Sequence, residues 1–391
     1  MGGNDTRAFW LLVALGVVVT VIGLAAAHVM EDRGHIVTGM NNQVVWGLPH
    51  VFAIFMIVAA SGVLNVGSIG SVFGRPEYKA RAPLSGLLCL AMLAGGLMVL
   101  VLDLGRPDRL VVAATHYNLS SVFAWNVLLY TGLAAVVAVY LWTLFERRLG
   151  LYVKPAGLAV LVWRFVLTSG TGLIFGFLVA RQAYQSALLA PLFIVLSFAW
   201  GMAVFLIVQS AMARWAGRRL DAALLRRMAR LLGVFVVASL YLVAAQHLTN
   251  LYFARQADFE TFLLRDGGVL TLLFWGGYVV AGSLLPLLLV FHPRLAGERG
   301  ALAASGLVIA GAFAWLYVFI VGAQAFPLDI FPGYTSSSSF GDGAIAHYVP
   351  SWPELLLGLG GVGATFLLTT VGVHVLDFMP RDDVPAAASG A

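Results

Sequence analysis

The sequence has 391 residues, of which 61% are hydrophobic and only 10% are charged. A soluble domain of this length needs a wetted surface with many more charged side chains, so the composition indicates a polytopic membrane protein. The single cysteine, Cys89, lies in an apolar stretch, which excludes disulfides, cysteine-ligated zinc and iron–sulfur clusters held by this chain alone. The net charge of +5 comes from arginines in predicted loops, and we expect no nucleic-acid partner.

Ten segments are apolar over the roughly 19 residues that a helix needs to cross a bilayer. Helices satisfy their own backbone hydrogen bonds in lipid, so the predicted fold class is an all-α integral membrane protein. The first segment is too long for a signal-peptide core and lacks a convincing cleavage site, so it counts as a span. The predicted spans are 9–30, 48–73, 84–103, 121–145, 157–180, 189–213, 228–253, 268–291, 301–325 and 352–376.

The distribution of lysine and arginine predicts the orientation. The N-terminus, the links after the second, fourth, sixth and eighth predicted spans, and the tail 377–391 hold 16 of these 23 residues, and the opposite loops hold six. The positive-inside rule therefore places both termini in the cytoplasm of a multi-pass protein, which in a bacterium lies in the inner membrane. The remaining cation, Arg164, falls within a span. We expect it to extend to the surface or to serve the structure, with a polar path through Thr168, Ser169 and Thr171 as the alternative.

The longest external loop covers residues 326–351 and contains neither lysine nor arginine. It combines Phe and Tyr with Pro, Gly and Ser, and Trp352 follows it directly. A loop of this kind is typical of a docking surface or a lid, so we predict a periplasmic docking loop. An aromatic belt at the membrane interface is the alternative.

Two spans joined by one basic turn carry ionisable residues at their far ends. His50 follows Pro49 at the start of the second span, and DLGRPDR ends the third span with Asp103 and Arg106. The hairpin should bring these three residues to the same external face, where a charge is costly unless it is paired or functional. We predict His50, Asp103 and Arg106 as catalytic, with Arg106 orienting Asp103 and affecting its pKa. A structural Asp103–Arg106 clasp, with His50 as an interfacial cap, is the alternative.

The segment HYNLSSVFAWN enters the fourth span at the same face. A planar quinone head group needs apolar walls, donors to its carbonyl oxygens and a proton exchanger, and this segment offers such side chains. Many interfacial segments offer them too. The predicted cofactor-binding residues are His50, Asp103, His116, Tyr117, Trp125, Asn126 and His247. No metal-binding residue is predicted. Haem b between His50 and His247 would require adjoining helices, and we do not expect it.

Several of these segments together resemble the NrfD/PsrC family of quinone-interacting membrane subunits. They are WGLPHVFAIFMIVAASG, DLGRPDR, HYNLSSVFAWN and FPLDIFPGY with the SSSSFGDG and YVPSWPELLLGLGG that follow. The resemblance implies two four-helix bundles, spans 2–5 and 6–9, flanked by spans 1 and 10. It also implies menaquinone or ubiquinone near the periplasmic face. His50, Asp103, Arg106 and Asn126 match family-type positions.

The resemblance further implies partners that carry the metal centres. These would be a periplasmic ferredoxin-like iron–sulfur protein, cytochrome c and further membrane or cytoplasmic redox subunits. The expected function is quinone-linked electron exchange in dissimilatory sulfur metabolism, by a subunit that is not catalytic alone. A membrane subunit of a hydrogenase is the alternative within the family. A secondary transporter and a passive anchor with a degenerate quinone site are alternatives of other classes.

Overall fold

The computed structural model describes residues 3–328, 334, 343–376 and 384–385. Within these ranges it contains ten helical runs that are long and apolar enough to cross a membrane, which confirms the predicted all-α class. The runs are α1 Gly3–Arg33, α2 Leu48–Ser71, α4 Ala82–Leu102, α6 Val122–Phe145, α7 Val153–Gly176, α8 Leu189–Trp215, α9 Ala222–Tyr252, then α11 Val269–Leu272 with η5 Leu273–Leu284 and α12 Leu285–Phe291, then α13 Glu298–Tyr317 with η6 Val318–Gly322 and α14 Ala323–Ala325, and α15 Trp352–Val375.

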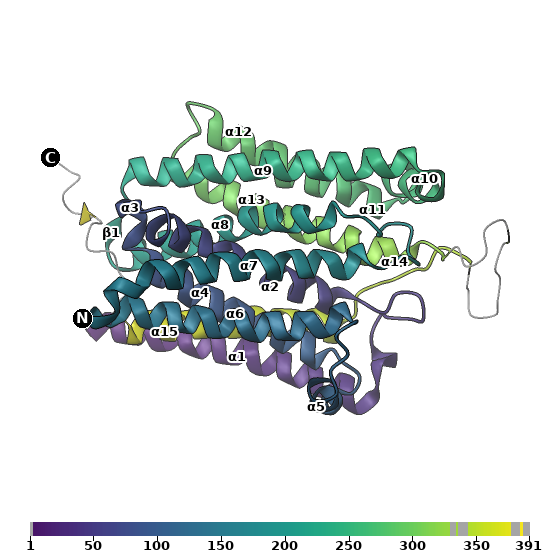
Figure 1. Ribbon diagram of the computed structural model, residues 1–391, viewed down its shortest axis with the longest axis horizontal. Helices are drawn as coiled ribbons and strands as arrows, with labels where there is room; N and C mark the ends of the chain where they lie inside the picture. The colour runs from purple at the N-terminus through teal and green to yellow at the C-terminus, as the bar shows by residue number, and fades with distance from the viewer. Residues whose placement is uncertain (1–2, 329–333, 335–342, 377–383, 386–391) are drawn as a thin grey trace.

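Short elements join these runs. They are η1 His35–Val37, α3 Pro76–Lys79, η2 Pro107–Arg109, α5 Leu110–Thr115, η3 Arg147–Tyr152, α10 Ala254–Thr261, η4 Phe262–Asp266 and the two-residue strands β1 Arg218–Arg219 and β2 Val384–Pro385. α5, α10 and α14 lie at one end of the molecule, here called the loop end (Figure 1). α3, β1 and the start of α1 lie at the opposite end, here called the terminal end (Figure 1).

The observed helix limits differ from the predicted span limits by up to six residues, at α1, which starts at Gly3, and at α9. The helix α9 starts at Ala222, six residues before the predicted limit, because its first turns carry Arg226, Arg227 and Arg230. Hydropathy marks only the part of a helix that lipid would cover, and an amphipathic extension beyond it leaves no apolar signal. The predicted tail 377–391 falls almost entirely outside the described residues.

α2 is the central helix. Of its 24 residues, all but Leu48, His50 and Ile69 are buried. It packs against α4, α7, α8 and α15, while α1 packs on α15. Further contacts join α4 to α6, α6 to α7, α8 to α9 and α13, and α9 to α12. These pairs are compatible with two four-helix bundles, but they do not by themselves delimit them, and that division stays a prediction.

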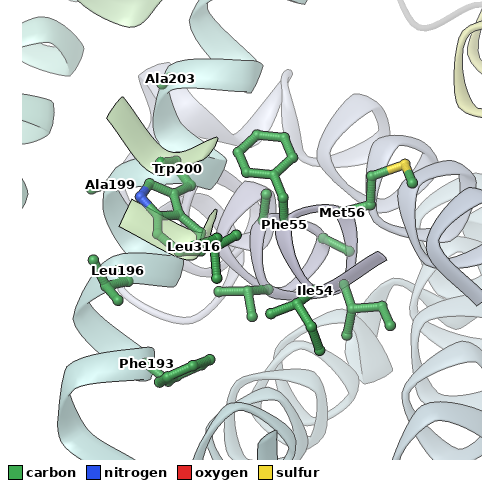
Figure 2. Packing of buried hydrophobic residues seen from close by; sticks show 14 of the residues in the cluster. Ile54, Phe55, Met56, Phe193, Leu196, Ala199, Trp200, Ala203 and Leu316 are labelled. Carbon is green, nitrogen blue, oxygen red and sulfur yellow. The ribbon is translucent and has the colours of Figure 1, made fainter. Parts of the chain in front are cut away.

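Glycines allow α2 and α8 to touch along their backbones. A Cβ on Gly201 would lie 2.1 Å from the carbonyl carbon of Gly62, and a Cβ on Gly62 would lie 1.6 Å from the carbonyl oxygen of Ser197. Close to this crossing, Figure 2 shows Phe55 of α2 beside Trp200 of α8, whose ring centroids are 5.9 Å apart. Small residues at helix crossings permit such close approach in membrane proteins.

Arg164 does not extend to the surface. Its residue is 3% exposed, and its guanidinium donates to Asn65 Oδ1 (2.7 Å) and to the carbonyl oxygen of Ser61 (3.1 Å), both on α2. The rings of Phe165 and Phe198 lie 5.2 and 5.4 Å from its Cζ atom. The cation therefore links α7 to α2, because amide and carbonyl oxygens together with aromatic faces replace the water it would have at the surface.

Two polar contacts fix the start of α2 at the loop end. The Tyr348 hydroxyl accepts from the backbone N–H of Leu48 (2.6 Å) and donates to Glu354 Oε1 (2.6 Å). Glu354 is fully buried, and its Oε2 accepts from the N–H groups of Gly39 (2.8 Å) and Ser351 (2.7 Å). Burial and the neighbouring Glu354 carboxylate raise the pKa of Tyr348, so the phenol stays protonated and able to donate.

The crossing of α2 and α8 yields a prediction about stability. We expect Gly201→Leu to destabilise the protein by about 3 kcal/mol, because its side chain would overlap the backbone of α2. Thermal unfolding in detergent measures this. Gly306→Leu on α13 is the control, because nothing lies within 4 Å of a Cβ added there. Equal melting temperatures for the two variants would contradict the close crossing.

Tyr348→Phe tests the contact at the start of α2. It removes the acceptor of the Leu48 amide and the donor to Glu354, which should cost about 1–3 kcal/mol and increase proteolysis of residues 343–351. Limited proteolysis together with thermal unfolding measures both effects. Tyr252→Phe is the matched control, because Tyr252 is 87% exposed. The contact has no stabilising role if both variants behave like the wild type.

Candidate functional site

A histidine–aspartate pair lies where α2 begins and α4 ends. His50 Nδ1 is 2.8 Å from Asp103 Oδ2, and the side chains are 15% and 1% exposed, respectively. The two helices are antiparallel neighbours, so the first turn of one meets the last residue of the other. The predicted proximity of His50 and Asp103 is therefore found, while their catalytic and binding roles stay predictions.

The sequence explains why each residue is placed there. Pro49 occupies the first turn of α2, where a missing N–H costs nothing, and His50 follows it. Asp103 is the C-terminal cap of α4, directly before the turn that contains Gly105. A carboxylate at a helix C-terminus faces the negative end of the helix dipole, so a proton or cation on His50 offsets that repulsion.

Aromatic rings cover one face of His50. The ring of Trp46 stacks on the imidazole with centroids 5.9 Å apart and planes at 25°. The rings of Phe175 and Phe123 pack edge-to-face with the Trp46 ring, and their centroids lie 5.8 and 6.4 Å from its centroid. The Gln324 side chain holds the backbone of Trp46: its Oε1 accepts from the Trp46 N–H, and its Nε2 donates to the Trp46 carbonyl oxygen (both 3.0 Å).

The carboxylate of Asp103 has unused acceptor capacity. Although His50 Nδ1 is close, neither Asp103 oxygen accepts a well-aligned hydrogen bond from any residue that the structure describes. Buried carboxylate oxygens are costly when their lone pairs are unused. The pair is therefore suited to a hydroxyl group or a water molecule that donates to Asp103.

Arg106 does not contact Asp103, so the predicted Asp103–Arg106 pairing is wrong. Its guanidinium instead donates to Asp108 from Nε (3.0 Å) and from an Nη atom (2.9 Å), and both side chains are more than half exposed. The Arg106 guanidinium holds the pKa of the Asp108 carboxyl below its usual value. Pro107 starts a new helical turn, which carries Arg106 away from the end of α4 and toward its own loop.

No contact among the described residues joins the other predicted residues of this region to the His50–Asp103 pair. His116 is exposed, and its Nδ1 lies 3.1 Å from the Thr115 hydroxyl. Tyr117 is half-buried. The indole of Trp125 donates to the carbonyl oxygen of Leu119 (2.6 Å), and Asn126 donates to the carbonyl oxygen of Gly170 (3.3 Å), which links α6 to α7. Their part in cofactor binding stays a prediction.

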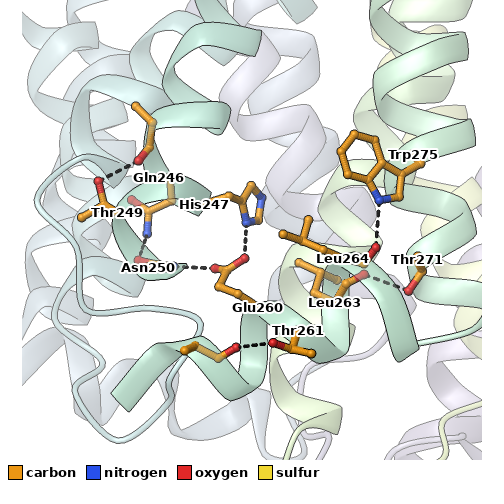
Figure 3. Close-up of polar contacts among 12 residues, drawn as sticks. Gln246, His247, Thr249, Asn250, Glu260, Thr261, Leu263, Leu264, Thr271 and Trp275 are labelled. Atoms are coloured by element: carbon orange, nitrogen blue, oxygen red, sulfur yellow. Dashed lines mark hydrogen bonds and ion pairs between the residues drawn. The ribbon is translucent and has the colours of Figure 1, made fainter. Parts of the chain in front are cut away.

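His247 belongs to a second pair, formed by α9 and α10. Its Nδ1 is 2.6 Å from Oε2 of Glu260, whose side chain is fully buried. Glu260 Oε1 accepts from Asn250 Nδ2 (2.8 Å), and Gln246 donates to Asn250 Oδ1 (3.2 Å). Figure 3 shows His247 and Asn250 both directed at the Glu260 carboxylate.

These residues line a small cavity of about 30 Å³ together with Phe274, Trp315 and Phe319. That volume holds one or two water molecules. Its walls include parts of the π-helical stretches η4, η5 and η6, and π-helices often occur at functional sites. His50 is not among its lining residues, so the two histidines belong to separate sites, and the part of His247 in quinone binding stays a prediction.

The sequence analysis missed Glu260, Trp46 and Gln324 as site residues. A signal for Glu260 was present, since Phe259, Phe262 and Leu263 follow helical spacing and place their neighbour on a buried face. Trp46 and Gln324 had no such signal, because 278 residues separate them along the chain. Among the described residues, no group of three or more His, Cys, Asp or Glu side chains is suited to a metal ion.

Comparison with known proteins reveals relatives of similar length. The chain is 28% identical to the Hdr-like menaquinol oxidoreductase integral membrane subunit of Archaeoglobus fulgidus, over 97% of this chain and 95% of that protein. It is 28% identical to a putative dimethyl sulfoxide reductase membrane subunit of Halobacterium salinarum, over 91% and 88%. Identity to a selenate reductase subunit of Mesobacillus selenatarsenatis is 22%, over 92% of each chain.

A family model described as "Polysulphide reductase, NrfD" matches residues 36–328. This region includes both histidine–carboxylate pairs and, among the ten membrane-crossing runs of the described residues, all those from α2 to α14. The match spans most of the sequence, and with the ten apolar helices it shows that this multi-pass membrane protein belongs to the NrfD family.

Proposed function

We propose that this chain is the quinone-reactive membrane subunit of a multisubunit redox complex. The observation that carries the proposal is the His50–Asp103 pair, a buried carboxylate 2.8 Å from an imidazole at the loop end of two membrane-crossing helices. Ionisable residues in such positions are costly and usually functional. The relative described as a menaquinol oxidoreductase membrane subunit supports the same class of reaction.

The residues at the pair suit a quinone or quinol head group. Asp103 has acceptor capacity that no described residue uses, which fits a donor hydroxyl. Trp46 and Phe123 offer aromatic surface beside His50. Such a combination of apolar walls with a few convergent polar groups is typical of small-molecule sites. Menaquinone and ubiquinone both fit this chemistry.

A bound quinol would supply two electrons to the partner subunits together with two protons. The chain's own part is to hold and move the protons. With Nδ1 facing Asp103, the His50 ring presents Nε2 as the atom that takes a proton from a hydroxyl group. The imidazolium that results is neutralised by Asp103, so the charge does not remain alone in a poorly hydrated place. Trp46 stacked on the ring fixes its plane.

We further propose a DsrP-like role in dissimilatory sulfur metabolism, with the loop end facing the periplasm and the termini in the cytoplasm. A ferredoxin-like iron–sulfur protein would dock on the loop end near residues 326–351, and cytochrome c and further redox subunits would complete the complex. The described part of that loop favours an ordered surface over a flexible tether, because the Tyr348 hydroxyl joins it to Leu48 of α2 and to Glu354 of α15. A HybB-like hydrogenase subunit is the alternative within the family.

A secondary transporter is the competing class. Ten spans and many glycines suit it, but its sites are usually made by broken helices near the middle of the bilayer. In the described residues, the two histidine–carboxylate pairs both involve the loop-end limits of helices. Substrate uptake by the purified chain in vesicles would favour the transporter.

Replacing either member of the pair should stop quinol-linked electron transfer. We expect His50→Gln and Asp103→Asn each to lower quinol oxidation or quinone reduction by the purified complex at least about 100-fold, because a positioned proton acceptor is lost. The set of proteins recovered by affinity purification should be unchanged. The measurements are quinol turnover with an artificial electron acceptor or donor and quantitative mass spectrometry of the recovered proteins.

Matched controls at the same end are His28→Gln and Asp32→Asn in the last turns of α1, which alter exposed residues. They should keep wild-type turnover. Wild-type quinol turnover in His50→Gln would contradict the proposal. Loss of the partner proteins in His50→Gln and Asp103→Asn, but not in the controls, would show that the pair serves as a structural clasp.

A further inference from the structure

A cavity lies at the terminal end, at the opposite end from the histidine pairs. It has a volume of about 670 Å³ and lies between the last turns of α8, strand β1 and the loop that leads into α13. Figure 1 places β1 at the end opposite to α10. Its charged and hydroxyl-bearing lining residues are Ser210, Arg214, Arg218, Arg294, Glu298 and Arg299.

The lining carries a clear excess of positive charge. Four arginines face one carboxylate, and Arg214 already contacts that carboxylate, with Nε and an Nη atom 3.0 and 2.8 Å from Glu298 Oε1. Arg218 has a partner of its own, so it is not counted as available to a ligand. For Arg294 and Arg299, the described residues provide no carboxylate within ion-pair distance. These two guanidinium groups are available to an anion.

The first turn of α13 adds donors to the same cavity. α13 has 20 residues, starts after Gly297 and, among the described residues, has no side chain that caps its N-terminus. The first helical backbone bond runs from the Ala301 N–H to the Gly297 carbonyl oxygen (2.9 Å), which leaves the N–H groups of residues 298–300 for another acceptor. The positive end of a helix dipole and free N–H groups together favour phosphate groups.

A buried hydroxyl points to a ligand independently of the helix end. Ser210 is 2% exposed and lines the cavity, yet its Oγ atom has no hydrogen-bond partner in the described part of the chain. On the same helix, Ser197 Oγ donates to the carbonyl oxygen of Ile194 (2.7 Å). An unpartnered buried hydroxyl is unfavourable, and a rotation of the Ser210 side chain toward the cavity would let it bond to an occupant.

The loop before α13 packs closely against the first turn of the helix. A Cβ on Gly300 would lie 2.0 Å from the carbonyl oxygen of Leu295, and that carbonyl accepts from the Gly297 N–H (2.8 Å). Only glycine fits at position 300, because any side chain there would overlap this carbonyl group and push the loop away from the helix. This close packing brings Arg294 and Arg299 to one cavity although the helix starts between them.

We propose that this cavity binds a phosphate-bearing anion, either the head group of an anionic phospholipid or a soluble phosphate compound. Arginine binds phosphate oxygens in pairs, and several donors around one cavity match a tetrahedral group better than a single carboxylate. A second small cavity shares Ala296 and Gly297, and its lining combines Leu225, Leu289 and Val290 with Arg226 and Arg230 between α9 and α12. Apolar surface next to a phosphate site suits a lipid, and basic pockets between membrane helices are typical phospholipid sites.

Binding to the full-length protein tests the proposal and separates the two sources. Native mass spectrometry of delipidated protein would be recorded with added phosphatidylglycerol, phosphatidylcholine or sodium pyrophosphate. We expect the double variant Arg294→Gln/Arg299→Gln to bind the phosphate compound at least about tenfold more weakly than the wild type. Arg147→Gln/Arg148→Gln, which removes two exposed arginines of η3, is the control and should bind like the wild type.

Each outcome decides a point. Preference for phosphatidylglycerol over phosphatidylcholine, lost only in Arg294→Gln/Arg299→Gln, identifies a phospholipid. Pyrophosphate binding with the same dependence identifies a soluble phosphate. Equal binding by the wild type and both double variants overturns the proposal. Binding that appears only after Asp382→Asn/Asp383→Asn also overturns it, because the acidic residues that precede Val384 in the sequence would then be the occupant.

Ser210→Ala provides a second test with little risk to folding. The hydroxyl has no partner to lose among the described residues, so we expect unchanged thermal stability and a several-fold weaker affinity for the phosphate compound. Ser197→Ala on the same helix is the control, because its hydroxyl already bonds within the helix. Unchanged affinity in Ser210→Ala would remove this hydroxyl from the site.

Discussion

Burial of α2 on every side is the constraint on which the rest of the structure depends. A helix surrounded by protein must fit its neighbours closely, and here the contact with α8 occurs through Gly62 and Gly201 with the two backbones touching. The same burial leaves no room for charges along most of its length. The one ionisable residue of α2, His50, lies in its first turn, where the chain enters from the loop end. The position of the candidate site thus follows from the position of the helix.

The two histidine–carboxylate pairs contain the same kinds of side chain but differ in how many hydrogen bonds their carboxylates accept. Glu260 has donors for both oxygens, from His247 and Asn250, and lies beside a cavity that fits only one or two water molecules. Asp103 has His50 close by but no well-aligned donor among the described residues. A satisfied pair stabilises a structure, whereas an unsatisfied pair is ready for a ligand. This contrast is why we assign the quinone chemistry to His50 and Asp103.

The two ends of the molecule carry different chemistry. The loop end carries the aromatic stack of Trp46 on His50, the two histidine–carboxylate pairs and the Tyr348–Glu354 hydrogen bond. The terminal end carries a cavity whose described lining residues include four arginines and one carboxylate. Under the functions proposed above, the loop end would exchange electrons and protons with partners, and the terminal end would meet anionic phosphate groups.

The amino-acid sequence was enough to establish the all-α class, the ten spans and the nearness of His50 to Asp103. Hydropathy and span length fix where helices cross a membrane, and a tight hairpin forces the far ends of its two helices together. Local sequence did not determine the partner of Arg106, because one turn at Pro107 decides whether it faces Asp103 or Asp108. The folded chain was needed to place Gln324 against Trp46, Arg164 against Asn65, and Arg294 with Ser210 in one cavity. Those contacts join segments distant in the chain, and their pairing depends on packing that no local pattern encodes.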